Sequence, residues 1–334
     1  MNFEKKPLLM FAVSAALLAV AAACSLAFGS VSISLKDLLA ALGGADSVYK
    51  IIVMDLRLPR TAGAALAGVA LAMAGSVLQC VTDNSLCAPN IIGVNSGAGL
   101  FVMLILCLAP GAWMLLPLAA FAGALCATAV VMGISFRGGG NTHGTSIVLS
   151  GVAVSAILNA GISFLSLRYP DVLSSYTAFS VGGFSGVRMS QLIIPVFVVA
   201  ICFCILQLLS PGLNMLCLGD EIAVSLGVKV KFIRLVSLIV CSALCAAAVS
   251  FAGLLGFVGL IVPNAVRRLA GVDMRFDIGL CAVCGAFITV LSDLVARVLF
   301  APAELPAGIV MAVLGSPFFL YLLIKRRRSY DTIQ

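Results

Sequence analysis

One stretch restricts the fold more than any other: residues 251–277, FAGLLGFVGLIVPNAVRRLAGVDMRFD. Gly253, Gly256 and Gly259 recur every three residues in its apolar part. They fall near one face of a helix, where small residues let a second backbone approach in a bilayer. Pro263 lacks a backbone donor, so we expect the helix to kink or restart there. The arginines that follow indicate where the chain leaves the membrane on the cytoplasmic side.

The rest of the chain has the same apolar character. Hydrophobic residues make up 62% of it and charged residues 10%, against about a quarter charged in soluble domains. A membrane span takes about 20 apolar residues, so about ten spans would leave only short loops in a chain of 334 residues. The composition predicts one all-α, polytopic membrane domain over residues 1–334, in contact with lipid.

Charge and cysteine content exclude several other classes of protein. The net charge of +7 fits the excess of Lys and Arg on the cytoplasmic side of membrane proteins. The sequence has no basic stripe with interleaved aromatic residues, so we expect no nucleic-acid binding. Nearly all of the 12 cysteines lie in apolar runs, where Cys acts as a small hydrophobe. The pair Cys281 and Cys284 has metal-ligand spacing but no nearby His. We therefore expect no metal site and infer no disulfide.

The apolar runs also predict an orientation. Residues 1–29 resemble a signal peptide, but their apolar run is longer than a usual signal core, so we interpret it as a retained first helix. With ten spans both termini lie on one side, and placing them in the cytoplasm puts 13 of the 20 Lys and Arg residues inside. The expected spans are about 8–28, 61–81, 93–108, 112–136, 146–166, 191–209 (ended by Pro211 and Gly212), 235–252, the broken span after 252, 278–299 and 307–324.

The segment 213–234 is the least membrane-like part of the chain. Two carboxylates after a glycine favour the start of a short helix, an i, i+4, i+8 apolar stripe gives it one hydrophobic face, and a second glycine would end it. Such a helix suits docking onto a cytoplasmic partner, although it could also lie on the lipid surface. The residues concerned are Leu218, Gly219, Asp220, Glu221, Ile222, Ala223, Leu226 and Gly227.

Six stretches, taken in order, resemble the FecCD-type permeases of ABC importers, which carry iron-siderophores, haem or cobalamin. The resemblance runs from about residue 50 to 324. The matching stretches are Arg57-Leu-Pro-Arg60, the region from Gly75 to Gly97, Leu218 to Gly227, Gly256 to Pro263 with Arg267 and Asp273-x-Arg275, Asp293 to Arg297, and Glu304-Leu-Pro-x-Gly308 with Gly315-Ser-Pro317-Phe.

The resemblance implies a type II ABC importer permease of ten helices. It implies a second copy of the chain, or a paralogous permease, with the translocation path between the two subunits. It also implies two cytoplasmic ABC ATPase subunits that meet 213–234 as a coupling loop, and an extracytoplasmic binding protein whose acidic groups meet Arg57, Arg60 and Arg297. The family usually has His after the proline of this motif, whereas this chain has Asn264, which cannot titrate near neutral pH.

The chain carries no machinery of its own for catalysis. It has no G-x-x-x-x-G-K-[ST] motif, so any ATP would be bound by a partner, and we expect no enzyme activity and no cofactor in this chain. Only Asp293 lies well inside an expected span, and Arg297 is one turn away as a partner for its charge. A carboxylate that is paired in this way is not suited to a proton relay, which argues against an ion-coupled transporter.

The sequence therefore predicts a permease subunit in the bacterial cytoplasmic membrane that imports an iron chelate, with ferric siderophore as the expected substrate. Cobalamin and haem stay open as substrates. An ion-coupled secondary transporter is the alternative class, and a membrane-embedded enzyme is a third. A neighbouring gene for an ATPase with a Walker motif would separate these classes.

Overall fold

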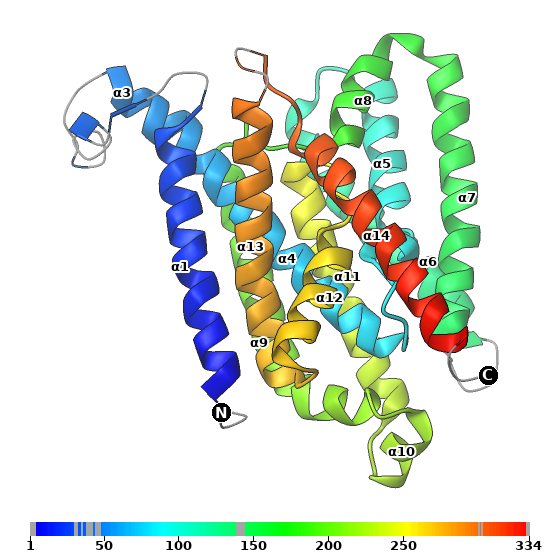
Figure 1. Cartoon of the computed structure of the whole chain (residues 1–334). Helices are drawn as coiled ribbons and strands as arrows, with labels where there is room; N and C mark the ends of the chain where they lie inside the picture. The colour runs from blue at the N-terminus through cyan, green and yellow to red at the C-terminus, as the bar shows by residue number, and fades with distance from the viewer. Residues whose placement is uncertain are drawn as a thin grey trace.

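The computed structural model describes residues 5–29, 33–34, 36–37, 43, 48–137, 144–299, 301 and 303–331, and all their regular elements are helical. Figure 1 shows a bundle of helices of mostly alternating direction. The α-helices are α1 (Lys5–Ala27), α3 (Val48–Ile51), α4 (Leu58–Val81), α5 (Val94–Leu108), α6 (Leu116–Arg137), α7 (Gly144–Arg168), α8 (Leu173–Val181), α9 (Met189–Leu216), α10 (Asp220–Ser225), α11 (Val230–Ala252), α12 (Val258–Ala270), α13 (Met274–Val298) and α14 (Ala307–Asp331). Short helical turns are η1 (Ile52–Arg57, π-helical), η2 (Pro89–Ile92), η3 (Trp113–Leu115) and η4 (Pro170–Val172).

The helices of the described residues can be assigned to ten passes through a membrane, the number that the apolar runs predict. In the described part of the chain, seven helices are long and apolar enough to span, and α5 and the first part of α14 are shorter apolar helices. The tenth pass is α12, which occupies the half of the bundle nearer α10 (Figure 1). The start of α1, the end of α14 and α10 lie at the same end (Figure 1), the cytoplasmic one. Between the expected spans 146–166 and 191–209 the chain forms a helix that the apolar runs did not predict, α8.

Helix α4 forms the centre of the bundle. Of its 24 residues 18 are buried, and it packs against α13, α11, α12 and α9. Glycine–glycine crossings permit this density: a Cβ on Gly68 would collide with the backbone of Gly285 in α13, and one on Gly75 with the backbone of Gly259 in α12. Small residues at the crossings allow the close backbone approach that drives helix association in lipid.

Helix α9 is longer than its proline suggested. The expectation that Pro211 ends the sixth span is wrong, because α9 runs on to Leu216. Pro211 cannot donate to the carbonyl oxygen of Gln207, one turn earlier. The hydroxyl of Ser210 donates to that oxygen instead, at 2.7 Å, so the helix continues without an unsatisfied acceptor.

The break predicted around Pro263 lies earlier in the chain. Helix α11 ends at Ala252, and Gly253 and Phe257 adopt φ of +69° and +66° before α12 begins at Val258. Pro263 is inside α12, and so it neither starts nor stops a helix. A positive φ is costly for a bulky residue; here the Phe257 ring packs where α14 has only a glycine, Gly315.

Candidate functional site

The short helix expected at the cytoplasmic end is α10. Gly219 precedes it with φ +108°, and Gly227 follows it with φ +81°. The amide of Gly227 donates to Val224 and that of Val228 to Ala223, which is the Schellman pattern that ends a helix. Both glycines therefore hold backbone conformations that an L-residue resists, and they fix the length of α10.

The apolar stripe of α10 faces outward. Leu218, Ile222 and Leu226 are 61%, 49% and 57% exposed, whereas Ala223, on the opposite side, is completely buried. In the described residues no other segment covers this stripe. A cluster of exposed leucine and isoleucine side chains on a helix outside the bundle is a surface suited to a partner.

An arginine on α11 fixes α10 to the bundle. Arg234 is almost fully buried, and its guanidinium lies 2.9 Å from Oδ1 of Asp220 in the first turn of α10. Its Nε donates to the carbonyl oxygen of Val81, the last residue of α4. One side chain thus connects α10, α11 and α4, so a displacement of α10 would act directly on the central helix.

Pro263 has a defined role inside α12. Its missing amide leaves the carbonyl oxygen of Gly259 without a partner in the helix. The side-chain amide of Gln79 on α4 donates to this oxygen at 3.2 Å, close to the crossing of Gly75 with Gly259. The proline therefore frees an acceptor that joins α12 to α4.

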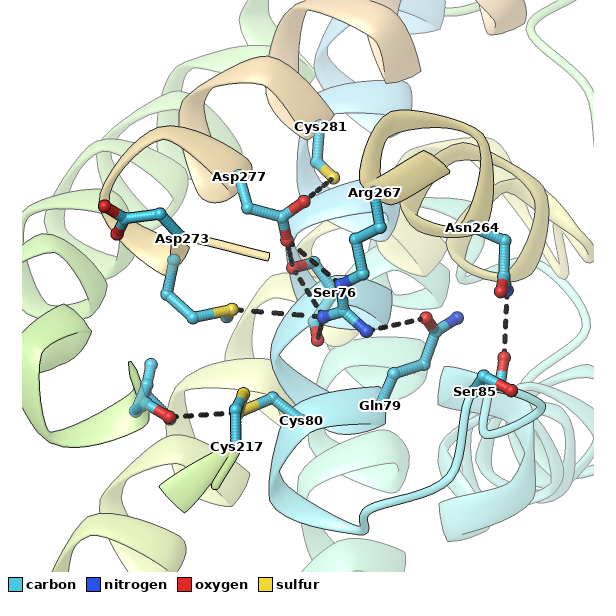
Figure 2. A network of polar contacts seen from close by, with 12 residues as sticks. Ser76, Gln79, Cys80, Ser85, Cys217, Asn264, Arg267, Asp273, Asp277 and Cys281 are labelled. Carbon is cyan, nitrogen blue, oxygen red and sulfur yellow. Dashed lines mark hydrogen bonds and ion pairs between the residues drawn. A yellow bond between two sulfur atoms is a disulfide. The ribbon is translucent and has the colours of Figure 1, made fainter. Parts of the chain in front are cut away.

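A buried ionic network extends from this point (Figure 2). Arg267 of α12 donates to the carbonyl oxygen of Ser76 at 2.7 Å and to Oε1 of Gln79 at 3.3 Å. Its Nε lies 3.5 Å from Asp277 of α13, whose carboxylate also accepts from the Ser76 hydroxyl. Arg267 points inward, so it does not simply mark the exit from the membrane. It joins α12 to α4 and to α13.

Asn264 connects α12 to the turn after α4. Its Nδ2 donates to the carbonyl oxygen of Ser85 at 2.9 Å (Figure 2) and to that of Leu260 at 2.8 Å. The side chain is buried. At this position the chain therefore uses an amide donor between two carbonyl oxygens, a role that does not depend on pH.

At the outer end, charged side chains from distant segments meet. Both oxygens of Asp293 on α13 accept from Nε of Arg60 at 3.0 Å, and Nη1 of Arg60 lies 2.5 Å from Glu304. Nε of Arg297 is 3.2 Å from Asp293. With Arg57, these residues form what we call the outer charge cluster, which joins α4, α13 and the segment before α14.

Two arginines of this cluster also hold α1. Arg57 donates to the carbonyl oxygens of Leu26 and Ala27 at 2.7 and 2.8 Å, and Arg297 donates to the hydroxyl and carbonyl oxygens of Ser25. Arg57 and Arg297 are 5% and 2% exposed. A pocket of about 480 Å³ opens over the cluster, and its wall includes all three arginines together with Asp55, Arg188 and Glu304.

Sequence spacing found the pair Asp293–Arg297 but missed its partner Arg60, which is 233 residues away along the chain. Asp277 was not considered as a site residue, because it precedes the expected span 278–299; it lies in the first turn of α13 and is buried. A signal for this second site was present: Ser76 and Gln79 are polar and one turn apart in the apolar C-terminal half of α4.

Comparisons with known proteins agree with this architecture. The model of the FecCD transport family matches residues 17–325. The Fe(3+)-citrate import system permease protein YfmE of Bacillus subtilis is 33% identical over 321 residues, 96% of each chain. The hemin transport system permease protein HmuU of Yersinia pestis is 34% identical, over 98% of this chain and 99% of the relative.

A solved inward-facing structure, of a transporter assigned to the metal-chelate type of ABC transporters, superposes with a TM-score of 0.85. It is 30% identical and covers 96% of this chain and 99% of its own. The matched residues include the outer charge cluster, the α12 network and α10. The chain therefore belongs to the FecCD transport family, as a multi-pass permease of the bacterial plasma membrane of the kind found in iron-chelate ABC importers.

Proposed function

We propose that this chain imports an iron chelate as one of two permease subunits, powered by ATP hydrolysis in separate ATPase subunits that dock on α10. The observation that carries the proposal is the outward-facing stripe Leu218, Ile222 and Leu226 on a helix that Arg234 fixes to α4. Burial of three such side chains stabilises a contact by about 1.5–3 kcal/mol each. The connection to α4 gives a route by which closure of the ATPase pair could move the bundle.

The single membrane domain, 1–334, carries no nucleotide or metal in this proposal. An extracytoplasmic binding protein would deliver the chelate at the pocket over the outer charge cluster. The three arginines there supply positive charge for acidic groups of that protein, and charges at the edge of an interface mainly steer the encounter.

Iron is favoured as cargo by the relatives, which include permeases of Fe(3+)-citrate, iron(3+)-hydroxamate, hemin and ferric enterobactin systems. We propose a ferric siderophore as the substrate. Uptake of labelled ferric siderophore, ferric citrate, haem and cobalamin, in cells with and without this chain, tests the choice. Loss of cobalamin uptake alone would reject iron as cargo.

Replacing both Leu218 and Leu226 by Asp tests the role of α10. We expect the permease to fold, the ATPase to dissociate, and uptake to fall to the background of cells without the chain. The matched control, Leu218→Met with Leu226→Met, keeps the apolar surface and should keep both binding and uptake. Normal uptake in the Asp variant would reject the coupling role of α10.

A further inference from the structure

Two cysteines lie together at the cytoplasmic end of the bundle, beside α10. Cys80 is in the last turn of α4, and Cys217 follows the end of α9. They are 137 residues apart in sequence, their Cα atoms are 5.5 Å apart, within the range that a disulfide requires, and their sulfur atoms are bonded (Figure 2). The other cysteines in the described residues are free thiols.

The surroundings of this pair suit both redox states. Sγ of Cys80 lies 3.3 Å from the carbonyl oxygen of Leu213, where a reduced thiol donates a hydrogen bond and a disulfide has no proton to give. Cys80 also lines a pocket of about 560 Å³ whose wall includes Asp83, Thr145 and Glu221. Cys80 is 5% exposed and Cys217 is half-buried, so the pocket gives small polar reagents a route toward the pair, which the completely enclosed Cys241 lacks.

The compartment argues against a permanent bond. Cytoplasmic thiols are kept reduced, and the disulfides found there are usually transient and often sense oxidants. We propose that Cys80 and Cys217 form a reversible thiol–disulfide site that reacts with hydrogen peroxide or organic hydroperoxides and, when oxidised, slows transport. The effect on transport rests on the proposed function; the chemistry of the pair does not.

The reaction is balanced by the peroxide alone. One thiolate attacks a peroxide oxygen, breaks the O–O bond and becomes a sulfenic acid, and the released hydroxide or alkoxide takes up a proton. The second thiolate attacks the sulfenic sulfur, forms the S–S bond and displaces hydroxide, which is protonated to water. Two thiols are oxidised, and one hydroperoxide is reduced to water and either a second water or an alcohol. Cytoplasmic dithiols reverse the reaction by exchange.

Oxidation would act on α10 through its N-terminal side. Cys217 is two residues before Gly219, which caps α10, so the disulfide ties the entry of α10 to α4. Arg234 already joins α10 and α4 through Asp220, but an ion pair can break and re-form, whereas the disulfide cannot do so without a reductant. Helix α10, which would have to move in each transport cycle, would then be held in one position.

Differential alkylation of the full-length chain in cells, read by mass spectrometry of the peptides containing Cys80 and Cys217, tests the site directly. We expect free thiols before peroxide, a disulfide after it, and recovery with a reductant. Uptake of the transported chelate should fall by about fivefold or more, the size of an ordinary allosteric coupling, and recover in parallel. The variant Cys80→Ser should transport normally and lose the response, whereas Cys204→Ser, at an exposed cysteine of α9, should retain it.

A pair that stays reduced in peroxide, or stays oxidised in untreated cells, would overturn the site. A disulfide that forms while uptake continues unchanged would overturn the regulatory effect. If no chelate is transported at all, the proposed function fails, but the alkylation result still decides whether the thiol site exists. Should Cys80→Ser fold poorly, Cys217→Ser gives the same comparison, because either change removes the bond.

Discussion

Replacing Asp293 by Asn should destabilise the bundle strongly, because this carboxylate is shared by two buried arginines. The Asp293 side chain is 1% exposed, accepts from Arg60 through both oxygens at 3.0 Å, and lies 3.2 Å from Arg297. Arg60 keeps a second partner in Glu304 at 2.5 Å. Among the described residues, Arg297 keeps hydrogen bonds only to the neutral oxygens of Ser25. The cost is therefore dominated by one uncompensated buried guanidinium, which is about 3–5 kcal/mol.

This loss of unfolding free energy can be converted into an expected fall in the melting temperature. At about 2.1 cal/mol/K of unfolding entropy per residue, a chain of 334 residues loses about 4–7 °C for 3–5 kcal/mol. Thermal unfolding of the purified permease in detergent, followed by size-exclusion of the surviving fraction, measures the shift. The matched control is Asp171→Asn, an exposed carboxylate after α7, which should shift the midpoint by less than about 1 °C. Equal midpoints for both variants would refute the view that the outer charge cluster stabilises the fold.

Two further predictions concern the crossing of α4 and α12. Gly75→Ala should destabilise the permease by at least about 1–3 kcal/mol, because the new Cβ would collide with the backbone of Gly259. The control Gly279→Ala should be neutral, because no atom lies within 4 Å of its new methyl group. Equal melting temperatures for the two variants would contradict this prediction. Gln79→Leu should cost about 1–3 kcal/mol by leaving the Gly259 carbonyl oxygen unsatisfied, and the cost should shrink in a Pro263→Ala background, where a backbone amide can donate to that oxygen. Additive effects in this double-mutant cycle would show that the proline and the amide act independently.

Hydrophobic pattern was sufficient for the number and order of the passes, because a membrane fixes the length and polarity of a span. The sequence predicted helix ends less well where a proline occurs. Pro211 and Pro263 each remove a donor, and whether a helix ends there depends on a side chain that can serve the freed oxygen. Ser210 adjoins Pro211 and could have been considered. Gln79 is 180 residues from the carbonyl that it serves, so no local rule could have found it.

The charged sites show the same limit. An i, i+4 pair such as Asp293 and Arg297 can be identified on one helix, but its partner Arg60 arrives from α4 only after the bundle has formed. The family resemblance, and not their spacing, suggested that Arg57, Arg60 and Arg297 contact another protein. Their guanidiniums are in fact used within the chain, so the docking role of these arginines stays a prediction, to be tested beside their structural role.

The two ends of the bundle would therefore bind partners through different interactions, electrostatic at the outer end and hydrophobic at the inner end. At the outer end a binding protein would meet arginines that already have internal partners, so its acidic groups could gain little energy from any one contact and would act mainly through long-range attraction, which salt weakens. At the inner end α10 presents apolar side chains that nothing in the described chain covers, and salt does not screen the hydrophobic effect that favours their burial. Rapid, salt-sensitive exchange of the binding protein and stable retention of the ATPase follow from this difference. Raising the salt concentration should release the first and leave the second bound.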